Sequence, residues 1–142
     1  MSIDKNFKVE ITKEINLQEI FYIYRETGWI DKSEKFNEVA YKKLVDNSFC
    51  FAVVKNNGKI ISMGRSISDG ISDAYIQDVA VLKEFRGLGI GKKIIESITD
   101  YLKKNNIGWI ALIAEPGAAD FYKKLDFEIM PDFTPMKYTI HR

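Results

Sequence analysis

The sequence has almost none of the residues that build disulfides or metal sites. Among its 142 residues there are one cysteine and one histidine, so no disulfide can form within the chain and no Cys/His cluster has metal-ligand spacing. Cys50 stands in an apolar run that begins at Phe49 and ends at Val54, and it is expected to be a buried strand residue. We therefore expect a functional site without a metal ion.

Long apolar runs and an excess of charge of one sign are absent as well. No segment approaches the ~20 apolar residues of a membrane-spanning helix, and residues 1–13 lack the apolar core of a signal peptide. The formal net charge is +1, which argues against a nucleic-acid surface. The composition, 46% hydrophobic and 29% charged, suits one compact core. We expect a single cytoplasmic domain, 1–142, with neither nucleic-acid nor membrane partners.

Hydrophobic periodicity predicts alternating strands and helices. Asn16 is expected to cap the first helix, which Gly28 ends, and Ser33 to cap a second helix that carries Phe36. Asn57 belongs to a hairpin turn signal with the glycine that follows it. The expected strands are 7–11, 49–55, 59–68, 74–82, 109–114, 127–130 and 136–140. The later helices are 90–104, with Ile94, Ile95, Ile98 and Leu102 buried, and 117–125.

The segment between the strand at 74–82 and the helix at 90–104 is the most informative. A helix N-terminus offers unpaired N–H groups and partial positive charge, which favours an anion such as phosphate. A P-loop would need Gly at 86 and Ser or Thr at 93, and a dinucleotide fingerprint would need Gly at 92 or 94. The sequence instead has an Arg-x-x-Gly-x-Gly pattern made of Arg86, Gly89 and Gly91. Without a ligand, the same glycines would only make a tight turn.

A second segment strengthens the functional interpretation. Residues 115–127 read Glu-Pro-Gly-Ala-Ala-Asp-Phe-Tyr-Lys-Lys-Leu-Asp-Phe. Together with the Arg-x-x-Gly-x-Gly loop, this segment resembles the signatures of the GCN5-related N-acetyltransferases, the GNAT family. The family usually has glycine where this chain has Asp126, and Asp tolerates the left-handed conformation expected at that helix end. Gly28-Trp29 and the segment 77–81 look like those of small bacterial members resembling arylalkylamine N-acetyltransferases.

The resemblance implies a fold and a cosubstrate. The GNAT fold is α/β (α+β), with a mixed, mostly antiparallel twisted sheet of about seven strands, helices on both faces and a splayed central parallel strand pair. The cosubstrate would be acetyl-CoA, whose pantetheine arm lies along the backbone of Val79, Ala80 and Val81 at the splayed pair. The residues expected to hold its pyrophosphate are Arg86, Gly87, Leu88, Gly89, Ile90, Gly91 and Lys92.

The resemblance also implies acetyl transfer to the primary amine of a small molecule, by direct attack in a ternary complex. Tyr122 stands where the family has a tyrosine facing the cofactor sulfur, and it is expected to protonate the leaving thiolate. Asp78 is a candidate base or water-orienting residue, although strand alternation aims it away from Tyr75 and Gln77 unless a bulge intervenes. A hydrogen-bonding role for Asp78 at the strand end, with a water chain as the proton exit, is the other interpretation. Trp29, Tyr75 and Gln77 are expected to bind the acceptor.

Two further functions stay open at this point. The acceptor could be a protein or peptide amine, since the chain is small and lacks an appended domain. Alternatively, the chain could be a non-catalytic acyl-CoA-binding module, against which the intact Tyr122 argues. Homodimers are frequent in the family, and exposed terminal strands would offer an edge for pairing, so a homodimer is a further expectation.

Overall fold

The computed structural model describes residues 6–141, which divide between Leu112 and Ile113 into two compact units. The first unit is a sheet with helices on both faces, and the second contains one short helix. The elements of the first unit are β1 (Val9–Ile11), α1 (Leu17–Glu26), α2 (Glu38–Asp46), β2 (Cys50–Asn56), β3 (Lys59–Ser68), β4 (Asp73–Val81), the 3-10 turn η1 (Lys83–Phe85), α3 (Ile90–Lys104) and β5 (Trp109–Ala111). The helix of the second unit is α4 (Ala119–Lys123).

The sheet is mixed and mostly antiparallel, as predicted. Its strands lie in the order β1-β2-β3-β4-β5. The first three pairings are antiparallel, and β4 pairs with β5 in parallel. The β2–β3 hairpin turns at Asn57 (φ +52°) and Gly58 (φ +80°), the two positive φ angles of a type I′ turn.

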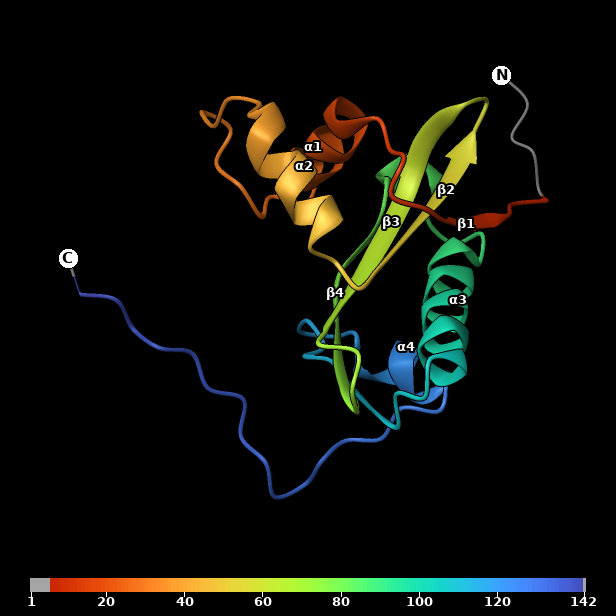
Figure 1. Ribbon diagram of the computed structural model, residues 1–142, viewed down its shortest axis with the longest axis vertical. Coiled ribbons are helices and arrows are strands. Elements are labelled where there is room, and N and C mark those ends of the chain that lie inside the picture. Colours follow the sequence, from red (N-terminus) through yellow and green to blue (C-terminus); the bar gives the residue numbers. More distant parts are fainter. Residues whose placement is uncertain (1–5, 142) are drawn as a thin grey trace. The chain divides into compact units, whose positions relative to one another are not determined.

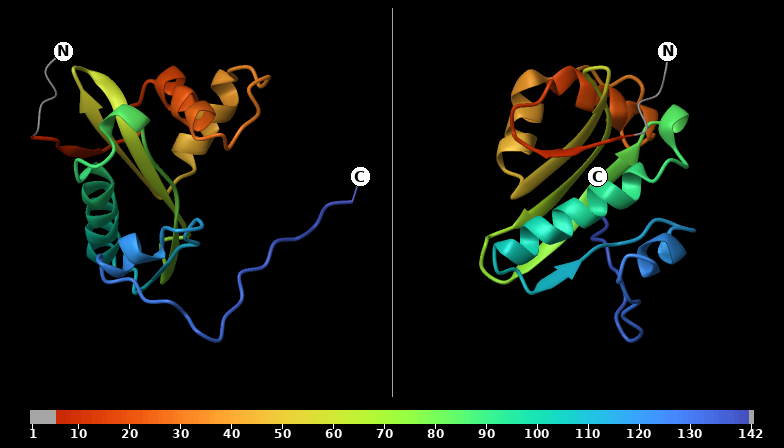
Figure 2. Two further views of the ribbon diagram at one scale, coloured as in Figure 1. Left: turned by 180° about the vertical axis from the view of Figure 1, so that it is seen from behind. Right: turned by 90° about the vertical axis from the view of Figure 1, so that its right-hand side faces the viewer.

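The two faces of the sheet are covered by different helices. Helices α1 and α2 lie over one face and α3 lies over the other (Figures 1 and 2). Side chains alternate along β3 accordingly: Met63 belongs to the core cluster with Ile20 of α1, while Gly64 faces Ile94 and Ile98 of α3. The expected helices on both faces are therefore confirmed within the first unit.

Helix α3 buries the four predicted residues of its apolar face, together with Ile90. We expect Ile98→Ala to lower the free energy of unfolding by about 2–5 kcal/mol, because a fully buried side chain leaves a cavity. Urea denaturation measures this loss. Lys104→Ala, an exposed position at the end of the same helix, is the control. Equal losses for the two variants would contradict the assignment of this face to the core.

The start of the second helix was predicted wrongly. Helix α2 begins at Glu38, and its cap is Asn37, whose side chain accepts a hydrogen bond from the Ala40 N–H. Ser33 instead donates its backbone N–H and its hydroxyl to Asp31 Oδ1, at 2.7 and 2.6 Å. Such a local side-chain turn competes with helix formation, so the cap moves to the next suitable residue.

The expected last strands are also absent from the described residues. Residues 127–130 and 136–140 form no strand, so the sheet has five strands rather than about seven. Met136, Tyr138 and Ile140 are 88%, 86% and 68% exposed. Alternating apolar residues indicate which side of a strand would be buried. A strand also needs the edge of a neighbouring strand for its backbone hydrogen bonds, and the sequence of the segment itself does not show whether such an edge is available. The expectation of a left-handed residue at the end of α4 is confirmed, since Asp126 has φ +68°.

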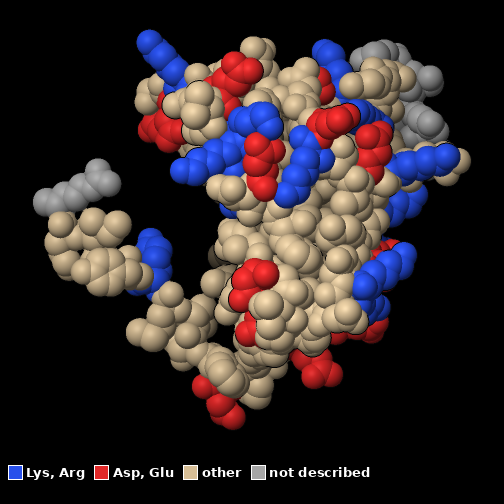
Figure 3. Space-filling model, in the orientation of Figure 1, with Lys and Arg blue, Asp and Glu red and all other residues tan. Residues whose placement is uncertain are grey.

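Charge and hydropathy are unremarkable over the described part of the chain. Basic and acidic side chains are mixed over α1 and α2 (Figure 3), so this face carries no field of a single sign. None of the helices in residues 6–141 has the length and apolar character needed to cross a membrane. In the same residues no three His, Cys, Asp or Glu side chains are grouped so that they could hold a metal ion.

Candidate functional site

The predicted anion-binding loop has the backbone geometry that its glycines suggest. Gly87 and Gly89 have φ +78° and +80°, a left-handed conformation that costs a residue with a Cβ roughly 1–2 kcal/mol. A Cβ added at either position would meet nothing within 4 Å. The space in front of these glycines is therefore open, and a ligand can approach the backbone closely.

The N-terminus of α3 has no side-chain cap among the described residues. Asn16 and Asn37 cap α1 and α2, but Gly89 provides no side-chain cap for α3. The first N–H groups of a helix have no intrahelical acceptor. The Arg86 Nε–H donates to Val81 O at 3.1 Å, which ties the loop to the end of β4. Open glycines and uncapped N–H groups together fit a phosphate group.

The seven predicted loop residues fall into two groups. Residues 86–89 lie in the loop, and residues 90–92 form the first turn of α3. The Ile90 side chain is buried, whereas Leu88 is 43% exposed. Lys92 forms an ion pair with Glu96 at 3.8 Å. Ile90 can thus contribute only its backbone N–H to a ligand, whereas Lys92 can also offer its ammonium group.

The edge of β4 opens beside this loop. The parallel pairing of β4 with β5 covers three residue pairs and ends at Tyr75↔Ala111. From there to Val81, the strand pairs only with β3 in the described residues. The Val79 side chain lies against Gly64 and Ala80 is part of the core, so these residues pack with their side chains while their backbone edge stays open. The parallel pairing is therefore short, and β5 ends at Ala111 rather than at residue 114 as predicted.

A β-bulge lies at the start of this open edge. Met63 pairs with Ala80 and Arg65 pairs with Gln77, so one residue of β3, Gly64, faces two residues of β4. One of the two is Asp78, a non-glycine residue with φ +57°. A Cβ at Gly64 would come within 2.7 Å of the Ile94 Cγ2 atom, so the bulge sits opposite a position where only glycine fits without movement.

The bulge reverses the direction that regular alternation alone would give the Asp78 side chain. Regular alternation aims Asp78 away from Tyr75 and Gln77. In the structure Gln77 shares a face with Arg65 through its pairing, and Asp78 contacts Arg65 and Tyr24 on that same face. The extra residue breaks the period of two, and a bulge is the exception to alternation that the sequence left open for this strand.

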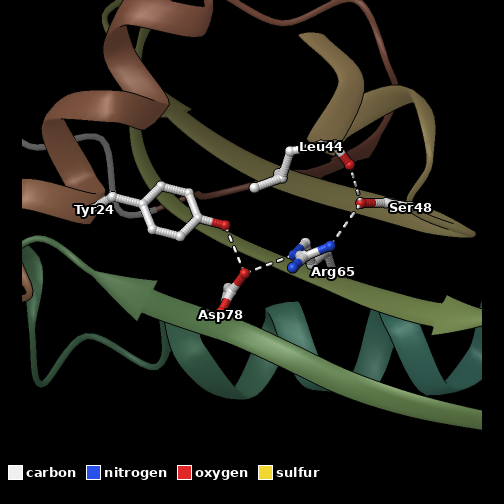
Figure 4. A network of polar contacts seen from close by, with 5 residues as sticks. All are labelled: Tyr24, Leu44, Ser48, Arg65 and Asp78. Atoms are coloured by element: carbon white, nitrogen blue, oxygen red, sulfur yellow. Dashed lines mark hydrogen bonds and ion pairs between the residues drawn. The ribbon is translucent and has the colours of Figure 1, made fainter. Parts of the chain in front are cut away.

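Asp78 is the centre of a polar network that joins four elements (Figure 4). Its Oδ2 atom accepts from the Tyr24 hydroxyl and from the Arg65 Nε–H, both at 2.6 Å. The Arg65 and Asp78 side chains are 16% and 24% exposed, so solvent screens the pair only in part. Arg65 Nη1 also donates to Ser48 Oγ at 3.4 Å, and Ser48 donates to Leu44 O at 2.7 Å.

Tyr24 acts in this network as a permanent donor. Burial raises the pKa of Tyr24 well above its usual range, and the neighbouring Asp78 carboxylate raises it further. The hydroxyl therefore stays protonated and donates to Asp78 at any physiological pH. Sequence reasoning missed Arg65 and this role of Tyr24. The available signal was Gly64, because an isolated glycine in a strand often marks a bulge or a close backbone approach.

The predicted acceptor residues lie at two places along this face. Trp29 is 38% exposed, and its ring contacts the Tyr24 ring edge-to-face with centroids 5.8 Å apart. Tyr75 is 46% exposed and contacts Trp109 in the same way at 5.5 Å. The structure thus links Trp29 to Asp78 through Tyr24, while Tyr75 lies on the β5 side.

Tyr122 belongs to the second unit and is described there by itself. It lies in α4, where its ring contacts those of Phe121 and Phe127 at centroid distances of 5.0 and 5.8 Å. Burial raises the pKa of Tyr122, and the Glu115 carboxylate adds to the rise. The hydroxyl therefore keeps its proton near neutral pH, as a proton donor must. Its role toward a cofactor sulfur stays a prediction.

Comparison with known proteins gives a consistent result. Residues 15–127 match the model of the acetyltransferase (GNAT) family. An uncharacterized N-acetyltransferase, ycf52, of Pyropia yezoensis is 33% identical over 131 residues, which cover 90% of this chain and 74% of that protein. Serotonin N-acetyltransferase 2, chloroplastic, of Oryza sativa subsp. japonica is 35% identical over 75 residues, covering 53% and 38% of the two chains. A solved structure of a probable acetyltransferase from methicillin-resistant Staphylococcus aureus superposes with a TM-score of 0.77 at 26% identity, covering 94% of this chain and 99% of that one.

Proposed function

The chain belongs to the acetyltransferase (GNAT) family, and we propose that it transfers the acetyl group of acetyl-CoA to the primary amine of a small molecule. One observation carries this proposal: the uncapped start of α3, with left-handed Gly87 and Gly89, is joined by the 3-10 turn η1 to the end of β4, whose backbone edge beyond Tyr75 is unpaired in the described residues. The first feature suits a pyrophosphate and the second an extended pantetheine arm.

The proposal assigns the binding of this cosubstrate to backbone groups of the chain. Acetyl-CoA would supply the acetyl group as a thioester. The backbone of Val79, Ala80 and Val81 would bind the pantetheine arm, and the N–H groups of residues 86–92 would bind the pyrophosphate. Hydrogen bonds to a charged group contribute about 1.5–3 kcal/mol each. Several of them together correspond to a dissociation constant in the micromolar range.

The proposed reaction is a direct attack in a ternary complex. The amine nitrogen forms a bond to the acetyl carbon, the carbon–sulfur bond breaks, the amine gives up a proton and the thiolate takes one. The attacking amine must be neutral, and amines in solution have a pKa near 10, so an acceptor for its proton is required. Asp78 and a water chain are the two candidates for that acceptor. Tyr122 is the proposed donor to the thiolate.

We propose an arylalkylamine as the acceptor. Trp29 and Tyr75 are both exposed in part on the face to which Asp78 points. Gln77 lies in β4, as Tyr75 does. Aromatic side chains favour a flat apolar body, and a rim of polar groups suits an amine. The name of the rice relative, a serotonin N-acetyltransferase, supports an arylalkylamine.

A panel of amines tests the function. The free thiol released from acetyl-CoA is measured with arylalkylamines, amino sugars, polyamines and lysine-containing peptides as acceptors. The proposal expects the highest kcat/KM for an arylalkylamine. Preference for a peptide would identify a protein or peptide acetyltransferase instead. Acetyl-CoA binding without turnover on any amine would identify a non-catalytic acyl-CoA-binding module.

The thiol of Cys50 is not expected to react with the reagent that detects free thiols in this assay. Burial raises the pKa of the Cys50 thiol to about 12, although Lys13 opposes the shift. Because the thiolate is the reactive form, a chromogenic disulfide reagent should label the native protein far more slowly than the urea-unfolded protein, which exposes one thiol per chain. Cys50→Ala gives the blank. Rapid stoichiometric labelling of native protein would show that Cys50 is accessible.

Two properties of the whole protein stay predictions. A homodimer is expected because homodimers are frequent in the family, and sedimentation velocity would measure the oligomeric state. A cytoplasmic location is expected from the sequence, and fractionation of the source cells would test it. Neither bears on the chemistry of the site.

A further inference from the structure

We propose that Asp78 is a positioning residue: anchored by Tyr24 and Arg65, it holds the β4 bulge and so aims the open backbone edge at Val79–Val81. This inference rests on the proposed function, because that edge is where acetyl-CoA would bind. It assigns the carboxylate a role other than proton acceptor, and it leaves water as the acceptor of the amine's proton.

The conformation of Asp78 needs an anchor. Asp78 has φ +57°. Asp tolerates a left-handed conformation better than most residues with a Cβ, but within a strand that conformation still costs energy and persists where the surroundings hold it. Two donors converge on its Oδ2 atom, Tyr24 from α1 and Arg65 from β3, both at 2.6 Å. Arg65 is itself tied to Ser48, which donates to Leu44 O in α2. The carboxylate thus joins the bulge to three other elements.

The bulge decides where the backbone of the open edge points. It inserts one residue opposite Gly64, and regular pairing with β3 resumes at Ala80↔Met63. Removing that extra residue would shift the register by one and turn every following side chain and backbone group to the opposite side. The direction of the Val79–Val81 edge toward the cosubstrate therefore depends on the conformation of the residue just before it.

Two substitutions at the same position separate an anchor from a base. Asp78→Gly removes the carboxylate but adopts a left-handed conformation without penalty. Asp78→Ala removes the carboxylate and keeps the penalty. Both variants leave Arg65 and Tyr24 without their acceptor, so the comparison between the two variants cancels that loss. If Asp78 is an anchor, the glycine variant should exceed the alanine variant about tenfold or more in CoA affinity and in kcat, since tenfold corresponds to 1.4 kcal/mol.

A catalytic base would behave differently. Both variants would then lose kcat equally, by roughly 10²–10⁴, and the acidic limb of the pH–rate profile would change in both. The glycine variant of an anchor should instead keep the native pH profile. Thermal midpoints are measured for every variant, so that a loss of activity through unfolding is recognised.

A double-mutant cycle tests the same inference if the alanine variant fails to fold. Tyr24→Phe should lower CoA affinity a few-fold in the native background and have no effect in the Asp78→Gly background, because Tyr24 acts only through the carboxylate. Tyr22→Phe, 51% exposed in the same helix, is the matched control. Equal effects of Tyr24→Phe in both backgrounds would overturn the inference.

The outcomes separate this inference from the proposed function. If the native protein acetylates amines while Asp78→Gly and Asp78→Ala are equally impaired, the function stands and the inference is overturned. If the native protein binds CoA but turns over no amine, the affinities of the two variants still decide the inference. If the native protein does not bind CoA, the proposed function and this inference are both overturned.

Discussion

Replacing Tyr122 by Phe is expected to lower kcat by roughly 10²–10⁴, the usual contribution of a general acid or base. The substitution deletes the proton that the leaving thiolate would take. It keeps the ring, whose edge-to-face contacts with Phe121 and Phe127 hold the side chain in place. The affinity for acetyl-CoA and the thermal midpoint should therefore change little.

The pH profile gives this prediction a second readout. Burial and the Glu115 carboxylate raise the pKa of Tyr122 above its ordinary value, which is about 10. The proton donor is present below that pKa and is lost as the pH rises through it. The native rate should therefore persist to a higher pH than a tyrosine with an ordinary pKa would allow, and Tyr122→Phe should lack this alkaline limb.

The control for Tyr122→Phe is Tyr138→Phe, which makes the same chemical change at a position that is 86% exposed in the same unit. It should leave kcat unchanged. If Tyr122→Phe turned over a good amine at the native rate across the alkaline range, the residue would only pack, and water would supply the proton. A loss of affinity with kcat intact would assign the hydroxyl to binding.

Replacing Gly89 by Val is expected to weaken CoA binding by roughly a hundredfold. The branched side chain of valine would project into the open space in front of α3. Valine would also have to adopt the left-handed conformation of Gly89, φ +80°, which is unfavourable for a residue with a Cβ. Losing two hydrogen bonds to charged phosphate oxygens amounts to about 3 kcal/mol, which converts to the stated change. Calorimetric titration with CoA measures it, and circular dichroism checks the fold.

The chain offers a close match for this control. Gly58 also has φ +80° and nothing within 4 Å of an added Cβ, but it lies in the β2–β3 hairpin turn. Gly58→Val carries the same backbone strain and should lower the thermal midpoint without reducing CoA affinity. If both glycine variants bound CoA as the native protein does, the pyrophosphate assignment would be wrong.

Local chemistry was enough to predict several elements of this protein. The 3.6-residue period of Ile94, Ile98 and Leu102 predicted α3 and its buried face, since a helix repeats its environment within its own segment. The Asn57-Gly58 turn and the glycines before α3 were recognised from the residue types at single positions. Their positive φ angles follow from what a single residue can adopt, whatever it packs against.

Other features of this protein, the direction of Asp78 and the absence of the last two expected strands, were decided only by the tertiary structure. The sequence by itself determined the helix faces, the turns and the glycine loop, each of which depends on residues close together in the chain. The direction of Asp78 depends on a bulge opposite Gly64 and on donors 54 and 13 residues away, Tyr24 and Arg65. The absence of strands at 127–130 and 136–140 likewise depends on whether an edge is available for pairing. Contacts between distant segments leave no periodic trace in either segment alone, because each partner's sequence is compatible with many neighbours.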